Sequence, residues 1–312
     1  MSGARLQLEA LPVVLAARLH ESTPEQRWLI ESLWGTEAVG VIGGTPKSYK
    51  TWLGLELAVS VASGTPCLGE FSIPKPGPAM VYLAEDSATV VRERLVALCA
   101  HRRVDIQTLD VRVITVPTLR LDCEDDVRRL GATLEQHKPA LLLLDPFVRL
   151  HAADENNAQA VAAILAHLRA LQRTHHVAIV VVHHTRKNSR GGQHGQSLRG
   201  SGDFHAWVDS ALYLTHEKQR LRLTIEHRAA PAPEARYLDL VGQPPHLELV
   251  CAPDLEPNLE ERVLTALRRA EEPLRRTALR GLLAVNNTRL GEALARLEQL
   301  GRVRRTAEGW AA

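Results

Sequence analysis

Several features that would place the sequence in a class of protein at once are missing from its 312 residues. No run of 18 apolar residues occurs, so a membrane-spanning helix of ordinary length is excluded. The apolar patch near the start is broken by Glu9, Pro12 and Arg18, which makes it a poor signal peptide. The few cysteines form no CxxC pair, which argues against a thiolate zinc site and suits a reducing compartment; they are Cys67, Cys99, Cys123 and Cys251. We therefore expect a cytoplasmic protein without a membrane partner.

Lysine is also scarce, because almost all the basic residues are arginine. Two of the six lysines, Lys47 and Lys50, nevertheless lie within four residues of each other. The net charge of +2 is unevenly distributed: residues 257–312 hold 11 Arg against 7 acidic residues, a net charge of +4, so the remainder carries −2. This distribution makes the carboxyl-terminal segment the more basic part of the chain.

Apolar runs alternate with helix-like stretches over most of the sequence. Runs typical of buried strands occupy residues 38–42, 79–83, 111–115, 140–145 and 177–182. Helix-like patterns lie between them, at residues 51–63, 88–101, 125–137 and 157–174. This order predicts an α/β fold with a mostly parallel central sheet covered on both faces. Residues 221–226 and 237–240 alternate apolar with polar side chains, as half-exposed strands do.

The Pro-rich stretch "QPPHLELVCAPDLEP" (243–257) predicts a domain boundary near residues 252–257. We expect a lead-in over residues 1–23, a large α/β domain over 24–250 and a small domain over 257–312. In the last, Leu259, Val263, Leu264 and Leu267 have helical spacing. Two further helices are expected in "RTALRGLL" (276–283) and "NNTRLGEALARLEQLG" (286–301), the second capped by Asn287 or Thr288 and ended by Gly301. The segment "RVRRTAEGW" alternates like a hairpin, so the domain is predicted to be winged-helix-like.

The stretch "VIGGTPKSYKT" (41–51) joins a predicted strand to a predicted helix through a glycine-containing loop, as a phosphate cradle requires. Lys50 would reach the β- and γ-phosphates and the Thr51 hydroxyl would hold Mg²⁺. Tyr49 stands where the strict pattern has glycine; it would cost about 1–2 kcal/mol if the position needs a positive φ, and little if it lies in the first helical turn. The nucleotide-binding residues expected from this loop are Gly44, Thr45, Pro46, Lys47, Ser48, Tyr49, Lys50, Thr51 and Trp52.

Ionisable residues follow three of the other predicted strands. Asp145 ends "LLLLD", which predicts a second ligand for Mg²⁺ beside Thr51. Glu85 and Asp86 follow residues 79–83, where one carboxylate can activate water and Asp86 or Ser87 can instead cap the next helix. His183 and His184 end the strand at 177–182. Because ligands of an open α/β sheet bind at the carboxyl ends of its strands, all of these residues are expected to face one crevice.

In this order, the motifs resemble the RepA-like branch of the RecA-type ATPases, to which hexameric plasmid replicative helicases belong. The resemblance covers roughly residues 24–245 and rests on "PKSYKT", "AED", "LLLLDP", "DENN" (154–157), "HHTRK" and "RGSG". It implies a RecA-like core, ATP with Mg²⁺, and assembly into a homo-oligomeric ring or filament, of which the ring is the main expectation. It also implies Lys50 and Thr51 at the phosphates and Mg²⁺, Asp145 as Walker B carboxylate, Glu85 as water activator, and His183 or His184 as γ-phosphate sensor.

The same resemblance implies two further features. Arg228 in "EHR" stands where related ring helicases carry an arginine finger, although Glu226 replaces the lysine of their K-x-R pattern, and Arg228 can equally be a solvated edge charge. The segment at 185–202 would face nucleic acid, with single-stranded DNA the expected partner. The residues expected to contact its phosphates without reading sequence are Arg186, Lys187, Arg190 and Arg199.

The sequence thus predicts a DNA-associated, Mg²⁺-dependent ATPase similar to RepA-type helicases. A regulator that binds DNA through the winged helix and uses ATP as a switch is the alternative, as is an ATP-dependent recruiter of a partner enzyme that does not unwind DNA.

Overall fold

The computed structural model describes residues 13–18, 27–154, 157–184, 204, 206–217, 220–250, 259–270, 272–283, 285–306 and 308–312. The chain divides into two compact units, Met1–Val250 and Cys251–Ala312. Each is described by itself below. Among the described helices, none is both long and apolar enough to cross a bilayer.

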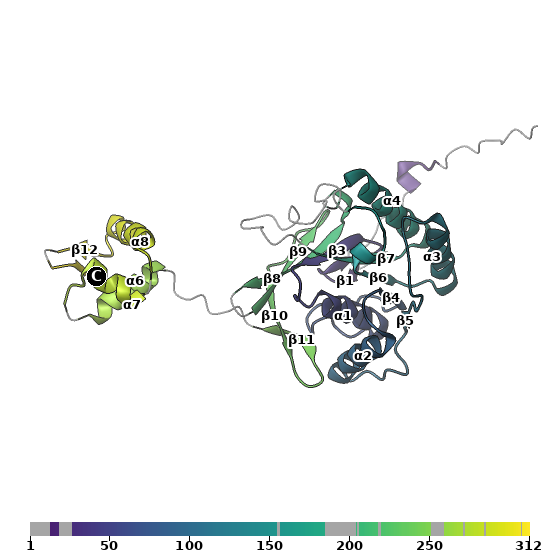
Figure 1. Cartoon of the computed structure of the whole chain (residues 1–312), viewed down its shortest axis with the longest axis horizontal. Helices are drawn as coiled ribbons and strands as arrows, with labels where there is room; N and C mark the ends of the chain where they lie inside the picture. Colours follow the sequence, from purple (N-terminus) through teal and green to yellow (C-terminus); the bar gives the residue numbers. More distant parts are fainter. Residues whose placement is uncertain are drawn as a thin grey trace, which may run out of the picture. The chain divides into compact units, whose positions relative to one another are not determined.

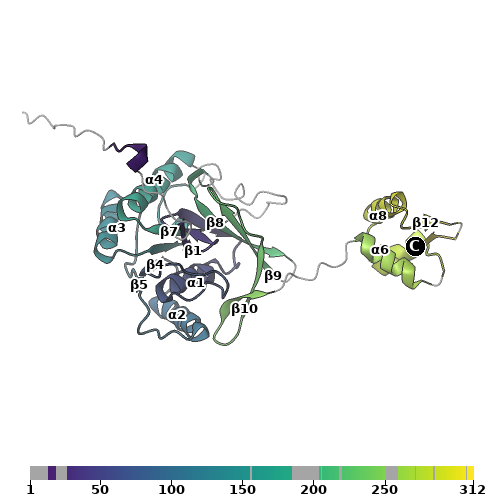
Figure 2. The ribbon, with the colours of Figure 1, turned by 180° about the vertical axis from the view of Figure 1, so that it is seen from behind.

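The first unit is built on one large sheet. Within the described residues it has nine strands in the order β11-β10-β9-β8-β3-β7-β6-β4-β5. The strands from β8 to β5 in this order run parallel, and β9, β10 and β11 extend the sheet as antiparallel strands, which Figure 2 shows at one edge. Their bounds are β3 Val39–Gly44, β4 Ala79–Leu83, β5 Val111–Val113, β6 Leu141–Asp145, β7 Ala178–His184, β8 Ser210–Glu217, β9 Arg220–His227, β10 Arg236–Val241 and β11 His246–Val250.

Two pairs of helices cover the two faces of this sheet (Figure 1). Helices α1 (Lys50–Ser63) and α2 (Ala88–Arg102) pack on one face, and α3 (Glu124–His137) and α4 (Ala158–His175) on the other. Because side chains alternate along a strand, Ile42 and Val182 belong to the α1 side and Val41 and Val181 to the α4 side. The predicted α/β architecture with a mostly parallel, doubly covered sheet is confirmed.

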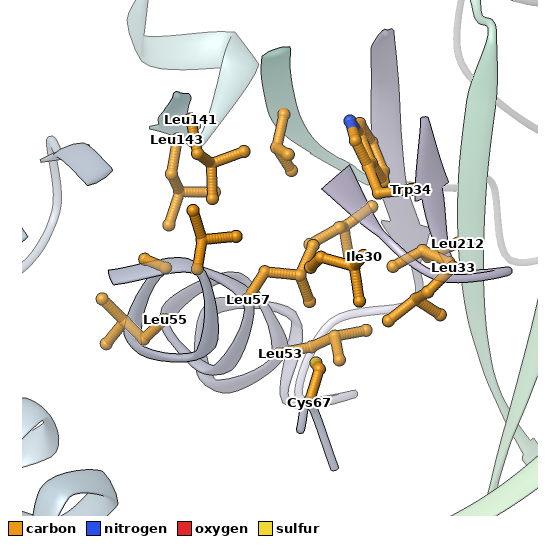
Figure 3. Packing of buried hydrophobic residues seen from close by; sticks show 14 of the residues in the cluster. Ile30, Leu33, Trp34, Leu53, Leu55, Leu57, Cys67, Leu141, Leu143 and Leu212 are labelled. Atoms are coloured by element: carbon orange, nitrogen blue, oxygen red, sulfur yellow. The ribbon is translucent and has the colours of Figure 1, made fainter. Parts of the chain in front are cut away.

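A small hairpin that the sequence pattern did not predict precedes β3. Strands β1 (Trp28–Ile30) and β2 (Trp34–Gly35) pair in a stretch that carries no clear periodicity. The Trp34 side chain is fully buried, and its indole N–H donates to the Ala38 carbonyl oxygen over 3.3 Å. Figure 3 shows the hairpin's Ile30, Leu33 and Trp34 in one apolar cluster with Leu53 and Leu57 of α1. The hairpin therefore supports the helix that follows the phosphate loop.

A close contact sets the distance between α1 and β6. Gly54 of α1 faces Leu143, and a Cβ on Gly54 would approach both Leu143 methyl carbons to 2.9 Å. Only a residue without a side chain lets the helix lie this near the strand. Gly54 is three residues after Thr51, and Leu143 is two residues before Asp145. The contact therefore places those two polar side chains next to each other.

The second unit has three helices and a short hairpin: α6 (Leu259–Arg269), α7 (Arg276–Leu283), α8 (Asn287–Gln299), β12 (Arg304–Arg305) and β13 (Trp310–Ala311). Leucine and valine side chains from all three helices form its core. The predicted cap of α8 was wrong by one residue, because the Asn286 side chain accepts the Arg289 backbone N–H over 2.9 Å. Leu274 pairs with Trp310, so a third extended segment lies beside the hairpin. The winged-helix interpretation of this unit stays a prediction.

Candidate functional site: a nucleotide-binding crevice

The carboxyl ends of four parallel strands meet at one edge of the sheet. Gly44 at the end of β3 pairs with His184 at the end of β7, and Leu83 at the end of β4 pairs with Asp145 at the end of β6. Strands β6 and β7 are direct neighbours. The loop after β3, the carboxylates after β4 and β6, and the histidines of β7 are thereby brought to a common crevice.

The loop between β3 and α1 has the backbone of a phosphate cradle with two strained positions. Lys47 has φ 64° and Tyr49, the residue before α1, has φ 58°. Tyr49 thus needs the left-handed region, which resolves the choice left open by the sequence. Its side chain is 39% exposed, so burial gives it little compensation. The backbone strain at Tyr49 is therefore not relieved, at the position where the strict pattern has glycine.

The side-chain ammonium of Lys50 lies inside this loop. Its Nζ donates to the Thr45 carbonyl oxygen over 2.8 Å, and the Ser48 hydroxyl donates to the same oxygen over 2.8 Å. Burial lowers the pKa of Lys50 to about 8, although the nearby Asp145 carboxylate raises it in part. A buried ammonium beside the N-terminus of a helix is suited to bind a phosphate oxygen.

Asp145 is the most strongly buried carboxylate of the crevice. It is 6% exposed, and burial raises its pKa to about 6, while a hydrogen bond from the Thr51 hydroxyl lowers the pKa and the charge of Asp86 raises it further. Its Oδ2 has no hydrogen-bond partner among the described residues. A buried, unsatisfied carboxylate oxygen beside a hydroxyl is an unfavourable arrangement by itself. It fits a hard divalent cation such as Mg²⁺.

No group of three or more His, Cys, Asp or Glu side chains in the described part of the chain is arranged to hold a metal ion. This agrees with Mg²⁺ rather than contradicting it, because Mg²⁺ is usually held by one or two protein ligands, with water and substrate phosphates completing its shell.

The two carboxylates after β4 have different surroundings. Glu85 is about half exposed and accepts from the Arg149 guanidinium over 2.8 Å. Asp86 pairs with Arg94 of α2 over 2.5 Å. Neither caps the helix; the Ser87 side chain accepts the Val90 N–H over 3.4 Å. The sequence analysis did not single out Arg149, although it stands four residues after Asp145, or Arg94, which no motif marks.

The two histidines of β7 lie on opposite faces of the sheet. His183 is buried and stacks on Phe204 at 4.7 Å between ring centroids, with Phe147 edge-on at 5.6 Å. By strand alternation, His184 lies on the α1 side, in register with Gly44 of the phosphate loop. The structure therefore places His184, and not His183, next to the loop.

A cavity of about 460 Å³ adjoins the crevice. Its walls include Trp52, which directly follows Thr51, and Arg94, which lies over the Trp52 ring at 5.8 Å from the centroid. Pro244 and Pro245, between β10 and β11, close another side. The cavity thus combines an indole face and apolar walls with the charged side chains of Arg92, Glu93 and Arg94.

Arg228 lies at the opposite edge of the sheet from the phosphate loop. It follows β9, whose last residue His227 pairs with Ser210 at the start of β8. Its guanidinium contacts the Asp209 carboxylate at 3.3 Å and donates to the Ala206 carbonyl oxygen. Arg228 therefore lies apart from the nucleotide crevice of its own chain, at the other end of the parallel strands. The predicted nucleic-acid contacts Arg186, Lys187, Arg190 and Arg199 lie outside the described residues.

Comparisons with known proteins agree with this architecture. A family model described as AAA domain matches residues 4–190. The ATPase domain of G40P is similar at TM-score 0.51 and 15% identity, over 66% of this chain and 82% of that one. The RadB recombinase is similar at TM-score 0.52 and 17% identity, over 69% of this chain and 92% of that one. The chain belongs to the AAA domain family, and its parallel sheet and phosphate loop have the fold of a RecA-like P-loop NTPase core.

Proposed function

We propose that this protein binds ATP with Mg²⁺ in the crevice, hydrolyses it, and uses the cycle to act on DNA in the manner of RepA-type helicases. One observation carries the nucleotide part: the buried Asp145 has an unsatisfied Oδ2 and a hydrogen bond from Thr51, directly beside the phosphate loop. A fold gains nothing from that arrangement without a ligand. Mg²⁺ bound there would neutralise phosphate charge during hydrolysis.

Each residue of the crevice then has a distinct task. Lys50 would exchange its bond to the Thr45 carbonyl oxygen for phosphate oxygens, and Thr51 and Asp145 would hold the Mg²⁺. Glu85 would accept a proton from the attacking water, because its carboxylate is accessible and stands at the neighbouring strand end. His184, in register with Gly44, is the better placed of the two histidines to contact the terminal phosphate.

We assign the adjoining cavity to the base of the nucleotide. Trp52 presents an indole face there, and Arg94 connects the cavity to the crevice because it also pairs with Asp86. An indole binds a purine ring by stacking and apolar contact. Stacking does not depend on the hydrogen-bonding groups at the edge of the base, so it does not select one base by them.

The finer assignment, to the RepA-like branch and to a ring acting on single-stranded DNA, is supported by the order of the motifs. Because Arg228 lies at the far edge of the sheet from its own phosphate loop, it can serve as an arginine finger only for the crevice of a neighbouring subunit. The alternative, a regulator in which ATP only switches assembly, would require the same nucleotide site without DNA-stimulated hydrolysis.

Replacing Lys50 with alanine should abolish hydrolysis and nearly all ATP binding. Each charge-assisted hydrogen bond to phosphate contributes about 1.5–3 kcal/mol, and the loss of the ammonium removes several such bonds. ATP binding by calorimetry and turnover by phosphate release, with and without single-stranded DNA, measure this. Wild-type turnover in Lys50→Ala would remove the phosphate-loop assignment.

Replacing Tyr49 with glycine should stabilise the protein slightly. Relief of about 1–2 kcal/mol of left-handed strain is offset by about 0.5–1 kcal/mol of added chain entropy in the unfolded state. Tyr49→Ala is the matched control, because it removes the ring and keeps the Cβ. A higher melting temperature for Gly than for Ala is expected; equal values would show that the position is not strained.

Replacing Glu85 with glutamine should preserve ATP binding and slow hydrolysis by roughly 10²–10⁴, the usual contribution of a general base. The amide keeps the shape of the side chain but cannot take up the proton. Asp86→Asn is the neighbouring control and should mainly loosen Arg94. If Asp86→Asn stops turnover while Glu85→Gln hydrolyses ATP normally, the two carboxylates have been assigned in the wrong order.

A further inference from the structure

The carboxyl-terminal unit carries a group of exposed arginines that have no carboxylate partner among the described residues. We call it the C-terminal arginine surface, and it consists of Arg275, Arg276, Arg289, Arg304 and Arg305, all of them exposed. None of these guanidinium groups forms an ion pair with a carboxylate of the described residues. By contrast, Arg296 pairs with Glu260 at 3.3 Å, and Arg262 donates to the Leu283 carbonyl oxygen at 2.8 Å.

Direct contacts connect the elements that carry this surface. Arg276, the first residue of α7, donates to the Asn287 carbonyl oxygen at the start of α8 over 2.5 Å. Its guanidinium lies so near Gly291 that a Cβ there would collide with it. On the other side, Arg305 pairs with Trp310, which pairs with Leu274, the residue before Arg275. Arg305 is thus two strand spacings, about 10 Å, from Leu274, which lies two residues before the start of α7.

We propose that the C-terminal arginine surface binds duplex DNA, with the first turn of α8 at the major groove and the arginines on the flanking phosphates. The basic residues of 257–312 are 11 arginines and no lysine. Arginine is the residue that pairs with phosphate bidentately. The exposed start of α8 offers the short polar side chains of Asn287 and Thr288 beside Arg289. A helix of this size enters the major groove of B-form DNA, whereas the major groove of an RNA duplex is too narrow.

Acidic side chains limit the contact to this part of the unit. Glu292 is exposed on α8 one turn beyond Thr288, and Glu308 is exposed at the hairpin turn. Both would repel phosphate, so the body of α8 and the hairpin tip are excluded from it. The proposal uses no residue of the ATPase unit and is therefore independent of the proposed ATP hydrolysis.

The test is fluorescence anisotropy of the full chain with a duplex of about 30 base pairs, roughly three helical turns, at about 50 and 200 mM salt. Replacing Arg304 and Arg305 together with alanine should weaken duplex binding about tenfold and reduce the salt slope by about one phosphate contact, because adjacent residues of a strand point to opposite faces. Arg289→Ala should weaken it about fivefold from a different element. The matched control is Arg268→Ala with Arg269→Ala, which removes the same charge from exposed residues at the end of α6.

Binding to single-stranded DNA and ATP turnover without DNA are measured on the same variants and should not change. Loss of duplex binding in the Arg304/Arg305 and Arg289 variants, with the Arg268/Arg269 control intact, supports the proposal. Equal losses in all three variants would reduce it to general charge attraction and overturn it. Full duplex binding in all three would also overturn it and would leave an acidic protein partner as the occupant of this surface. An absence of ATP turnover in the wild type would count against the proposed function alone.

Discussion

The nucleotide crevice depends on how closely α1 approaches β6. The contact between Gly54 and Leu143 has no room for another methyl group, and it fixes the helix that begins with Lys50 and Thr51 against the strand that ends in Asp145. Because a well-packed core deforms little, this distance is set by apolar packing. The hairpin of β1 and β2 supports α1 through the same apolar cluster. The polar site is therefore positioned by the packing of apolar side chains.

The site is costly to the folded protein. Burial disfavours the charged form of Lys50 and of Asp145, as the directions of both pKa shifts show. Tyr49 and Lys47 add backbone strain in the loop between β3 and α1. Strain and desolvation gathered at one strand edge are typical of a functional site. Lys50 and Asp145 compensate each other's charge only in part, and a bound phosphate and Mg²⁺ would supply further opposite charge.

Much of the first unit could be predicted from the sequence, because buried parallel strands are continuous apolar runs bounded by polar residues. The strand ending in Asp145 is of this kind, and the apolar helix after the phosphate loop was predicted up to its end before Gly64.

The hairpin around Trp34 was missed because its strands are too short for a period to be visible. The φ of Tyr49 could not be derived, since the motif allowed either geometry. The split between His183 and His184 follows from alternation, but only once the register with β3 is known. The ion-pair partners of Glu85 and Asp86, which are Arg149 and Arg94, lie on other elements, so no local sequence pattern predicts them.

The most direct test of this account is the thermal stability of Asp145→Asn with and without Mg²⁺-ATP at pH 8. The pKa of Asp145 is raised to about 6 in the folded protein, above its usual value of about 4. The ionised carboxylate therefore destabilises the fold above pH 6, by on the order of 2–3 kcal/mol, and the penalty disappears as the pH falls toward 4. The account predicts that Asp145→Asn melts at a higher temperature than the wild type without nucleotide, and that Mg²⁺-ATP stabilises the variant less. A variant that melts lower without nucleotide, yet gains as much from Mg²⁺-ATP as the wild type, would contradict it.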